Sequence, residues 1–167
     1  MTTRQHPTAI TTTAALVTQR IPVQAKLAAA WTSFMFLVIY IDYFHLYQPG
    51  EIDEIRGGDI FMFDISGTLM SIFFALITIP TLMVLLSTTL PARVNRATNL
   101  VVAALFIPIC VFNAAGASWQ WAFYYGLTIG VEVLILAFIL RSAWTWPSTA
   151  PPVTMATSPE RAAVRTD

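Results

Sequence analysis

The chain has 167 residues, of which 56% are hydrophobic and only 11% are charged, and nine Lys and Arg balance nine Asp and Glu. Soluble domains carry about twice this share of charge, so a water-soluble fold is disfavoured, and zero net charge removes the basic surface that nucleic-acid binding needs. One cysteine, Cys110, and two histidines disfavour a disulfide, a CxxC redox pair or a thiolate zinc site, so we expect no metal centre.

Four apolar stretches are long enough to cross about 30 Å of hydrocarbon, which takes roughly 20 helical residues. The predicted fold class is therefore all-α, an integral membrane bundle of four transmembrane helices within a domain at residues 26–146. Residues 1–25 form an N-terminal tail without an apolar core of signal-peptide length, and residues 147–167 form a disordered C-terminal tail rich in Pro, Ser, Thr and Ala. The predicted helices cover residues 27–47, 61–86, 98–115 and 119–140.

The basic residues predict the orientation of these helices, because Lys and Arg in short flanks stay on the cytoplasmic side. Only Arg56 lies between the first and second helices or between the third and fourth. Both termini and the middle loop are therefore expected in the cytoplasm. The other eight basic residues are Arg4, Arg20, Lys26, Arg93, Arg96, Arg141, Arg161 and Arg165.

The first predicted helix carries an acid and a histidine on one stripe, since residues three, four and seven apart share a helix face. Asp42 lies toward the outer end, and His45 lies one turn further out as its only candidate counter-ion. The remaining members of the stripe are Trp31, Met35 and Val38.

Asp64 lies three residues into the second predicted helix, at the top of a stripe of small and polar side chains. Such a stripe favours close helix contact and interhelical hydrogen bonds. The loop before it is acidic, with Glu51, Asp53 and Glu54 against Arg56, and is interpreted either as a solvated face or as a negative outer mouth that attracts cations.

The segment between the second and third helices combines a helix stop with two arginines. Pro91 ends the second helix, Arg93 and Arg96 hold the loop in the cytoplasm, and Asn95 is expected to cap the third helix with its side-chain oxygen. The same two arginines are the candidates for binding an anionic lipid headgroup.

The last predicted helix carries a carboxyl group near mid-span. Glu132 shares a face with Tyr125, and on the third helix Cys110 and Asn113 fall close to one side. An ionised acid at this depth costs about 2.5 to 3.5 kcal/mol on the insertion scale, and no Lys or Arg lies within any predicted span. We therefore expect Glu132 to be largely neutral at pH 7, or to be reached by water or a cation.

A second face of the last helix is made of small residues. Ala122, Gly126 and Gly130 follow the small-xxx-small spacing, which lets helix backbones approach closely. Packing within the bundle is the favoured interpretation, and packing against another subunit is the alternative.

Two segments resemble a family of small bacterial four-helix membrane proteins of unknown function. One is Pro91-Ala-Arg-Val-Asn-Arg-Ala-Thr-Asn-Leu100 after the apolar run MVLLS, and the other is Ala143-Trp-Thr-Trp-Pro147. The likeness covers residues 27–147, with the acid of the last helix as part of the pattern. It implies four spanning helices in a bacterial inner membrane and carries no catalytic residue onto this chain.

These features give two functional hypotheses. The first is a proton- or cation-coupled small carrier or channel that uses a polar core formed by Glu132, Asp42, His45, Asp64 and Asn113. The second is a non-catalytic membrane subunit or scaffold whose helices pack against a second copy or a partner protein. No HExxH, GxSxG, P-loop or dinucleotide motif is present, so neither an enzyme nor a cofactor is expected, and the lipid bilayer is the predicted environment.

Overall fold

The computed structural model describes residues 21–60, 63–115 and 118–146. Four long helices make up most of this part of the chain, and the 3-10 turn η1 (Trp119–Trp121) leads directly into the last of them. Each, with η1 counted as part of the last, is long and apolar enough to cross a membrane. The all-α class and the four long apolar helices are thus confirmed. They are α1 (Val23–His45), α3 (Gly67–Thr89), α4 (Ala92–Phe112) and α5 (Ala122–Trp144).

The loop after α1 contains regular structure that the sequence did not predict. It forms a short helix, α2 (Glu51–Gly57), and an antiparallel pair of two-residue strands, β1 (Asp59–Ile60) and β2 (Phe63–Asp64). Gly50 and Gly58 flank α2 with φ angles of 97° and 100°. Only glycine adopts this left-handed region at little cost, so these two residues allow the sharp turns that fold α2 back beneath the bundle.

Several helix boundaries differ from the prediction. Phe63 and Asp64 lie in the strand pair rather than in a helix, and α3 starts only where the Ser66 hydroxyl accepts a hydrogen bond from the Leu69 amide at 3.1 Å. At the other connection, α4 begins at Ala92 rather than at residue 98, because the polar PxRxNR segment is itself helical. Of the predicted tails at 1–25 and 147–167, residues 1–20 and 147–167 lie outside the described residues, and α1 already begins at Val23.

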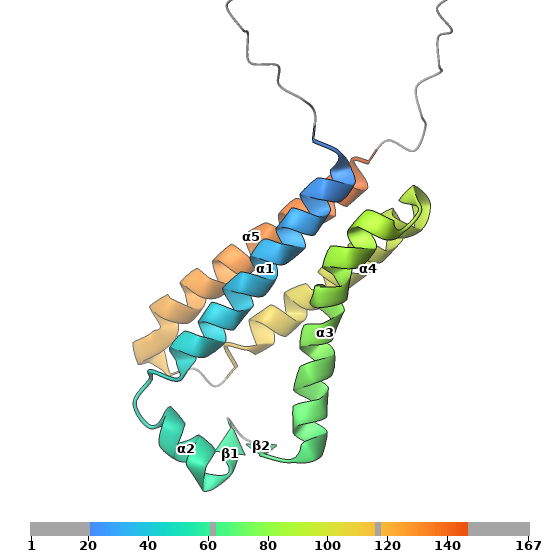
Figure 1. Cartoon of the computed structure of the whole chain (residues 1–167). Coiled ribbons are helices and arrows are strands. Elements are labelled where there is room, and N and C mark those ends of the chain that lie inside the picture. The colour runs from blue at the N-terminus through green and yellow to red at the C-terminus, as the bar shows by residue number, and fades with distance from the viewer. Residues whose placement is uncertain (1–20, 61–62, 116–117, 147–167) are drawn as a thin grey trace, which may run out of the picture.

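The long helices pack in the order α3, α1, α5, α4 (Figure 1). The α3–α4 turn lies at the same end of the bundle as the start of α1 and the end of α5. Along its length α3 changes direction, and it contains Pro80, which lacks the backbone N–H that would bond the carbonyl four residues earlier. As a result, α3 packs against α1 but diverges from the other helices toward its own N-terminus.

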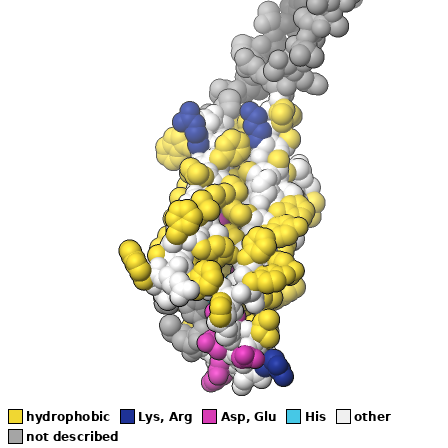
Figure 2. Space-filling model, turned by 90° about the vertical axis from the view of Figure 1, so that its left-hand side faces the viewer, with side chains coloured by type: hydrophobic (Ala, Val, Ile, Leu, Met, Phe, Trp, Pro, Cys, Tyr) yellow, Lys and Arg dark blue, Asp and Glu magenta, His cyan; other side chains and the backbone are white. Residues whose placement is uncertain are grey.

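Charge divides the bundle into two ends (Figure 2). Lys and Arg side chains gather at the end nearest the termini, whereas Asp and Glu side chains gather at the opposite end, with an apolar surface between them. We call these the basic end and the acidic end. The basic end holds Lys26, Arg93, Arg96 and Arg141, and the acidic end holds α2 with Arg56.

The apolar core lies in the half of the bundle nearer the basic end. Three aromatic rings from α1 and α4 pack edge to face there, with centroids 5.8 to 6.2 Å apart, a geometry that the ring quadrupoles favour. They are Trp31, Phe34 and Phe106. Leu136 and Ile139 of α5 complete this layer and are fully buried. The half nearer the acidic end is packed more loosely, and most side chains of α3 there are exposed.

A fully buried polar network lies beside this core and joins three helices. The Trp31 indole N–H donates to Asn99 Oδ1 at 2.7 Å, and the Asn99 amide donates to Asn95 Oδ1 at 2.6 Å. Asn95 in turn donates to the Ser87 carbonyl at 2.6 Å, and the Ser87 hydroxyl donates to Asn99 Oδ1 at 3.4 Å. The network therefore ties α1, α3 and α4 together at the basic end.

This network corrects the role expected for Asn95. The N-cap of α4 is Pro91, with no side-chain cap, and Asn95 lies inside the helix. Its amide bonds the end of α3 instead, because the tight turn at Pro91 brings the last carbonyls of α3 against the first turns of α4. Helix ends leave carbonyls without partners, and a buried carboxamide satisfies one of them here.

Candidate functional site

Glu132 is the buried carboxyl group of the described chain. It lies near the middle of α5 with 3% of its surface exposed, on the same face as Tyr125, Leu136 and Ile139, all of which are buried. Spacings of three, four and seven residues place these side chains on one face, as the helical period predicts. The carboxyl group therefore points into the bundle and away from its exposed surface.

Cys110 of α4 is the direct neighbour of Glu132. The thiol is 2% exposed and lies within interaction range of the carboxyl group. A thiol is a weak donor, so this contact only partly replaces the hydration that an ionised carboxylate loses on burial. The sequence placed Cys110 and Asn113 close to one side of the third helix, and the structure shows that the neighbour of Cys110 is Glu132 on α5.

No basic side chain neutralises Glu132 in the described part of the chain. The one salt bridge among the described residues joins His45 and Glu51. The group that acts on Glu132 through its charge is Asp42 of α1, a second acid. Two carboxylates within range of each other repel when both are ionised, so a proton or a bound cation between them lowers the energy of the pair.

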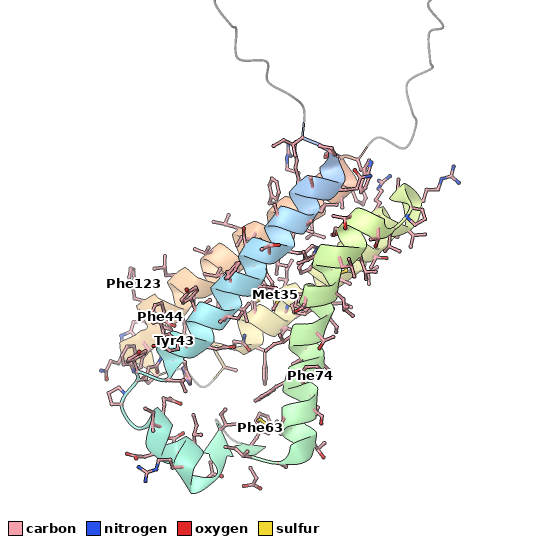
Figure 3. The ribbon with its side chains drawn as sticks, in the orientation of Figure 1. Met35, Tyr43, Phe44, Phe63, Phe74 and Phe123 are labelled. Atoms are coloured by element: carbon pink, nitrogen blue, oxygen red, sulfur yellow. The ribbon has the colours of Figure 1, made fainter. Side chains whose placement is uncertain are left out.

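Asp42 lies where the stripe on α1 passes from buried to exposed side chains. Along its predicted stripe Trp31 is buried, Met35 and Val38 are partly buried, and Asp42 is exposed. In Figure 3 Met35 points from α1 toward α3, where the Thr81 hydroxyl lies 3.8 Å from its sulfur. The side chains of this stripe thus become more exposed toward the acidic end, and solvent can reach Asp42 from that end.

His45 ends α1 and is held by residues from α2 and α5. Its Nε2 lies 2.9 Å from Glu51 Oε2, and its Nδ1 lies 3.0 Å from the Tyr125 hydroxyl, which also accepts from the Gln48 amide at 3.4 Å. We call His45, Gln48, Glu51 and Tyr125 the acidic-end cluster. The sequence prediction named Asp42 as the partner of His45; Asp42 is within electrostatic range, but the ion pair is made with Glu51.

Tyr125 connects the acidic-end cluster to the face that carries Glu132. The two residues are seven positions apart on α5, which is two helical turns, or about 10 Å along the axis. Beside it, the Tyr124 hydroxyl donates to the Ile41 carbonyl at 3.2 Å and joins α5 to α1. From the acidic end inward, the Glu51 carboxylate, the His45 imidazole and the Tyr125 hydroxyl are therefore in contact, and Glu132 lies two helical turns further along α5.

Two predicted members of the polar core lie elsewhere. Asp64 is exposed in β2, where it is the register partner of Asp59, because the helix begins only at Gly67. Asn113 is the exposed C-cap residue of α4. Asp64 and Asn113 are therefore exposed and do not lie beside Glu132 in the buried part of the bundle.

The small-residue face of α5 does not pack within the bundle. A Cβ atom added at Gly126 or Gly130 would meet nothing within 4 Å, and both glycines are exposed, while Ala122 is partly buried. The favoured interpretation, packing between helices of the same chain, is wrong because the core-facing side of α5 is the side that carries Glu132. This face is open in the described structure.

Arg93 and Arg96 lie in the first turns of α4 rather than in a loop. Arg93 is exposed, and the Arg96 guanidinium lies 5.9 Å from the centroid of the Trp144 ring, in cation–π range. This contact joins the start of α4 to the end of α5 at the basic end. Of these two arginines, Arg93 is therefore the one whose side chain is exposed.

Exposed aromatic side chains gather near the acidic end. Tyr43, Phe44 and Phe123 project from α1 and α5 away from the core (Figure 3), as expected of rings at the level of lipid headgroups. Just beyond α1, the Tyr47 hydroxyl lies 2.5 Å from that of Tyr43, and this hydrogen bond raises the pKa of the Tyr47 phenol.

The described residues contain no group of three or more His, Cys, Asp or Glu side chains arranged to hold a metal ion. What the arrangement offers chemically is a titratable carboxyl group in a dry position, with a second acid and a hydroxyl–imidazole cluster between it and the acidic end. Such an arrangement suits binding and release of a proton or a small cation.

Comparison with known proteins places this chain within a described group. A family of unknown function (DUF6326) matches residues 20–150, which include every described helix and strand. The chain belongs to this family. The resemblance expected from the PxRxNR segment is thereby confirmed, and no curated protein and no solved structure matches the chain. For this member of DUF6326, function has to be argued from the site itself.

Proposed function

We propose that the protein is a multi-pass membrane protein in which Glu132 binds and releases a proton, or a small cation, during transport. The observation that carries this proposal is the buried Glu132 carboxyl group, which no described Lys or Arg neutralises and whose neighbour is the Cys110 thiol. Ionisable groups at membrane depth are expensive to maintain, and those inside bundles commonly serve ion or proton pathways.

The packing around Glu132 supports access from one side. Asp42 and the acidic-end cluster lie between Glu132 and the acidic end, where the helices are loosely packed. Between Glu132 and the basic end, the interior of the bundle is filled by the aromatic core and by the buried network around Asn99. Access to the buried Glu132 would therefore come from the acidic end, and a carrier would also need a second conformation in which the network at the basic end separates.

Proton flux in proteoliposomes tests this function directly. Wild-type protein and the Glu132→Gln variant are compared under an imposed membrane potential, with internal pH as the readout. The chemistry we propose needs no enzymatic step and no cofactor, since the chain itself supplies the titratable groups. Absence of flux in both proteins would contradict the transport proposal.

We also propose that the protein lies in the bacterial inner membrane with both termini and the basic end in the cytoplasm. Positive charge in short flanks favours the cytoplasmic side, and the structure gathers Lys26, Arg93, Arg96 and Arg141 at one end. The acidic end, with α2, would then face outward.

Labelling of introduced cysteines by a membrane-impermeant maleimide in intact cells checks this orientation. We expect Glu54→Cys on α2 to react and Val94→Cys on α4 to react only after lysis, because both positions are exposed but lie at opposite ends. The native Cys110 is buried and serves as a low background. Equal labelling of both variants in intact cells, or labelling of Val94→Cys alone, would contradict the orientation.

A scaffold or membrane subunit is the second candidate, and the open Gly126 and Gly130 face favours it. In membranes such faces pack closely against other helices, and nothing in the described chain covers this one. The expected result of Gly130→Leu separates the candidates. A scaffold would lose its partner or oligomer on size-exclusion chromatography, whereas a carrier acting alone would keep both its mass and its proton flux.

A further inference from the structure

A lateral groove of about 480 Å³ runs between the first half of α1 and the second half of α5. Small side chains of α1, at Ala25, Ala29 and Ser33, form one wall, and larger side chains of α5, among them Leu134 and Phe138, form the other. The groove exists because residues four apart on α1 are small and so leave space against the bulkier α5. We call it the α1/α5 groove.

The groove combines a charged end with an apolar length. Lys26 lies at its basic end, is exposed, and forms no salt bridge with any described residue. From Ala25 to Ser33 the groove follows α1 for about 12 Å at 1.5 Å per residue. One leaflet of a bilayer contributes about half of the 30 Å of hydrocarbon, so the groove reaches from the interface toward the bilayer centre.

We propose that the α1/α5 groove binds one acyl chain of an anionic phospholipid from the leaflet at the basic end, with the lipid phosphate at Lys26. The apolar walls match the chain, and the ammonium group matches the phosphate. A second copy of the protein fits less well, because it would bury the Lys26 charge without a described acid to pair with it. The proposal requires that the protein spans a membrane, but it does not require proton transfer at Glu132.

Lipid binding to the full chain in detergent, measured by native mass spectrometry, tests the headgroup contact. Phosphatidylglycerol and phosphatidylcholine with the same acyl chains are the two probes. We expect wild-type protein to prefer phosphatidylglycerol, and Lys26→Gln to lower its affinity about fivefold, the effect of one basic residue near an anionic surface. Arg56→Gln, at the acidic end, is the matched control and should leave the preference unchanged. Equal binding of both lipids by wild-type protein would overturn the proposal.

The acyl-chain contact is tested by filling the groove. Ala29→Leu is expected to abolish retention of both lipids, whereas Ala137→Leu, an exposed position of α5 outside the groove, should retain them. Unchanged binding by Ala29→Leu would overturn the proposal, as would a shift from dimer to monomer mass in that variant, which would identify a second copy as the occupant. Glycerol phosphate without acyl chains should not compete, and competition equal to that of the lipid would also refute a lipid site.

Discussion

Proteoliposomes containing Glu132→Gln are expected to show proton flux reduced to the level of empty vesicles. Glutamine keeps the shape of the side chain and its capacity to pair with the Cys110 thiol, but it cannot bind and release a proton. Because Glu132 is the buried acid of the described bundle and Asp42 is its charged neighbour, loss of titration at this position interrupts the proposed path at its deepest point. The measurement is the rate of internal acidification under a potassium diffusion potential.

Two further variants make this result specific. Glu54→Gln removes an exposed acid of α2 in the same way and should leave the flux unchanged. Asp42→Asn should reduce the flux while leaving the fold intact, since Asp42 is exposed and its side chain forms no hydrogen bond with another described residue. Wild-type flux in Glu132→Gln would refute the role of this carboxyl group, provided that both proteins elute as single peaks on size-exclusion chromatography.

Replacing Asn99 by leucine is expected to lower the free energy of unfolding by about 2 to 3 kcal/mol. Leucine keeps the volume but leaves the Trp31 indole N–H and the Asn95 carboxamide without their partner, and a buried unsatisfied group costs about 1 to 3 kcal/mol. Reversible unfolding in detergent or bicelles, followed by tryptophan fluorescence, gives the value. Asn113→Leu is the matched control at the exposed end of α4 and should change stability by less than about 0.5 kcal/mol.

A double-mutant cycle isolates the contact between α1 and α4. Trp31→Phe removes the indole N–H and keeps an aromatic ring, so its combination with Asn99→Leu should be less destabilising than the sum of the two. Interhelical hydrogen bonds in membranes average about 0.6 kcal/mol and reach about 1.7 kcal/mol, which bounds the coupling energy we expect. Strict additivity of the two substitutions would show that the Trp31–Asn99 hydrogen bond does not hold the basic end closed.

The network around Asn99 also shows where reasoning from the sequence failed. The sequence predicts Asn95 as a helix cap and gives Asn99 no role beyond the segment at residues 91–100, because polar residues lower the apolar signal that marks a span. Their partners Trp31 and Ser87 come from two other helices. No local pattern identifies a hydrogen bond between residues 68 positions apart, so the sequence alone could not predict this network.

The predictions for Asp64 and His45 differ from the structure for a related reason. Apolar residues of the strand pair extend the apolar stretch of α3, so a hydropathy window counted Asp64 as part of the span although the backbone there is extended. His45 was paired with Asp42 by helical spacing, but α2 folds back and presents Glu51 to it. A chain reversal at Gly50 decides this pairing, and such a reversal becomes visible only in the coordinates.

By itself, the sequence determined the four apolar helices, the separation of basic from acidic ends, and the face of α5 that holds Tyr125 and Glu132, because length, charge and the 3.6-residue period are local properties. Tertiary structure alone decided what each face meets: Cys110 beside Glu132, open surroundings for Gly126 and Gly130, and a groove at Lys26. The physical reason is that a helix fixes the direction of a side chain relative to its own axis, whereas contacts depend on how separate helices are rotated and tilted against one another.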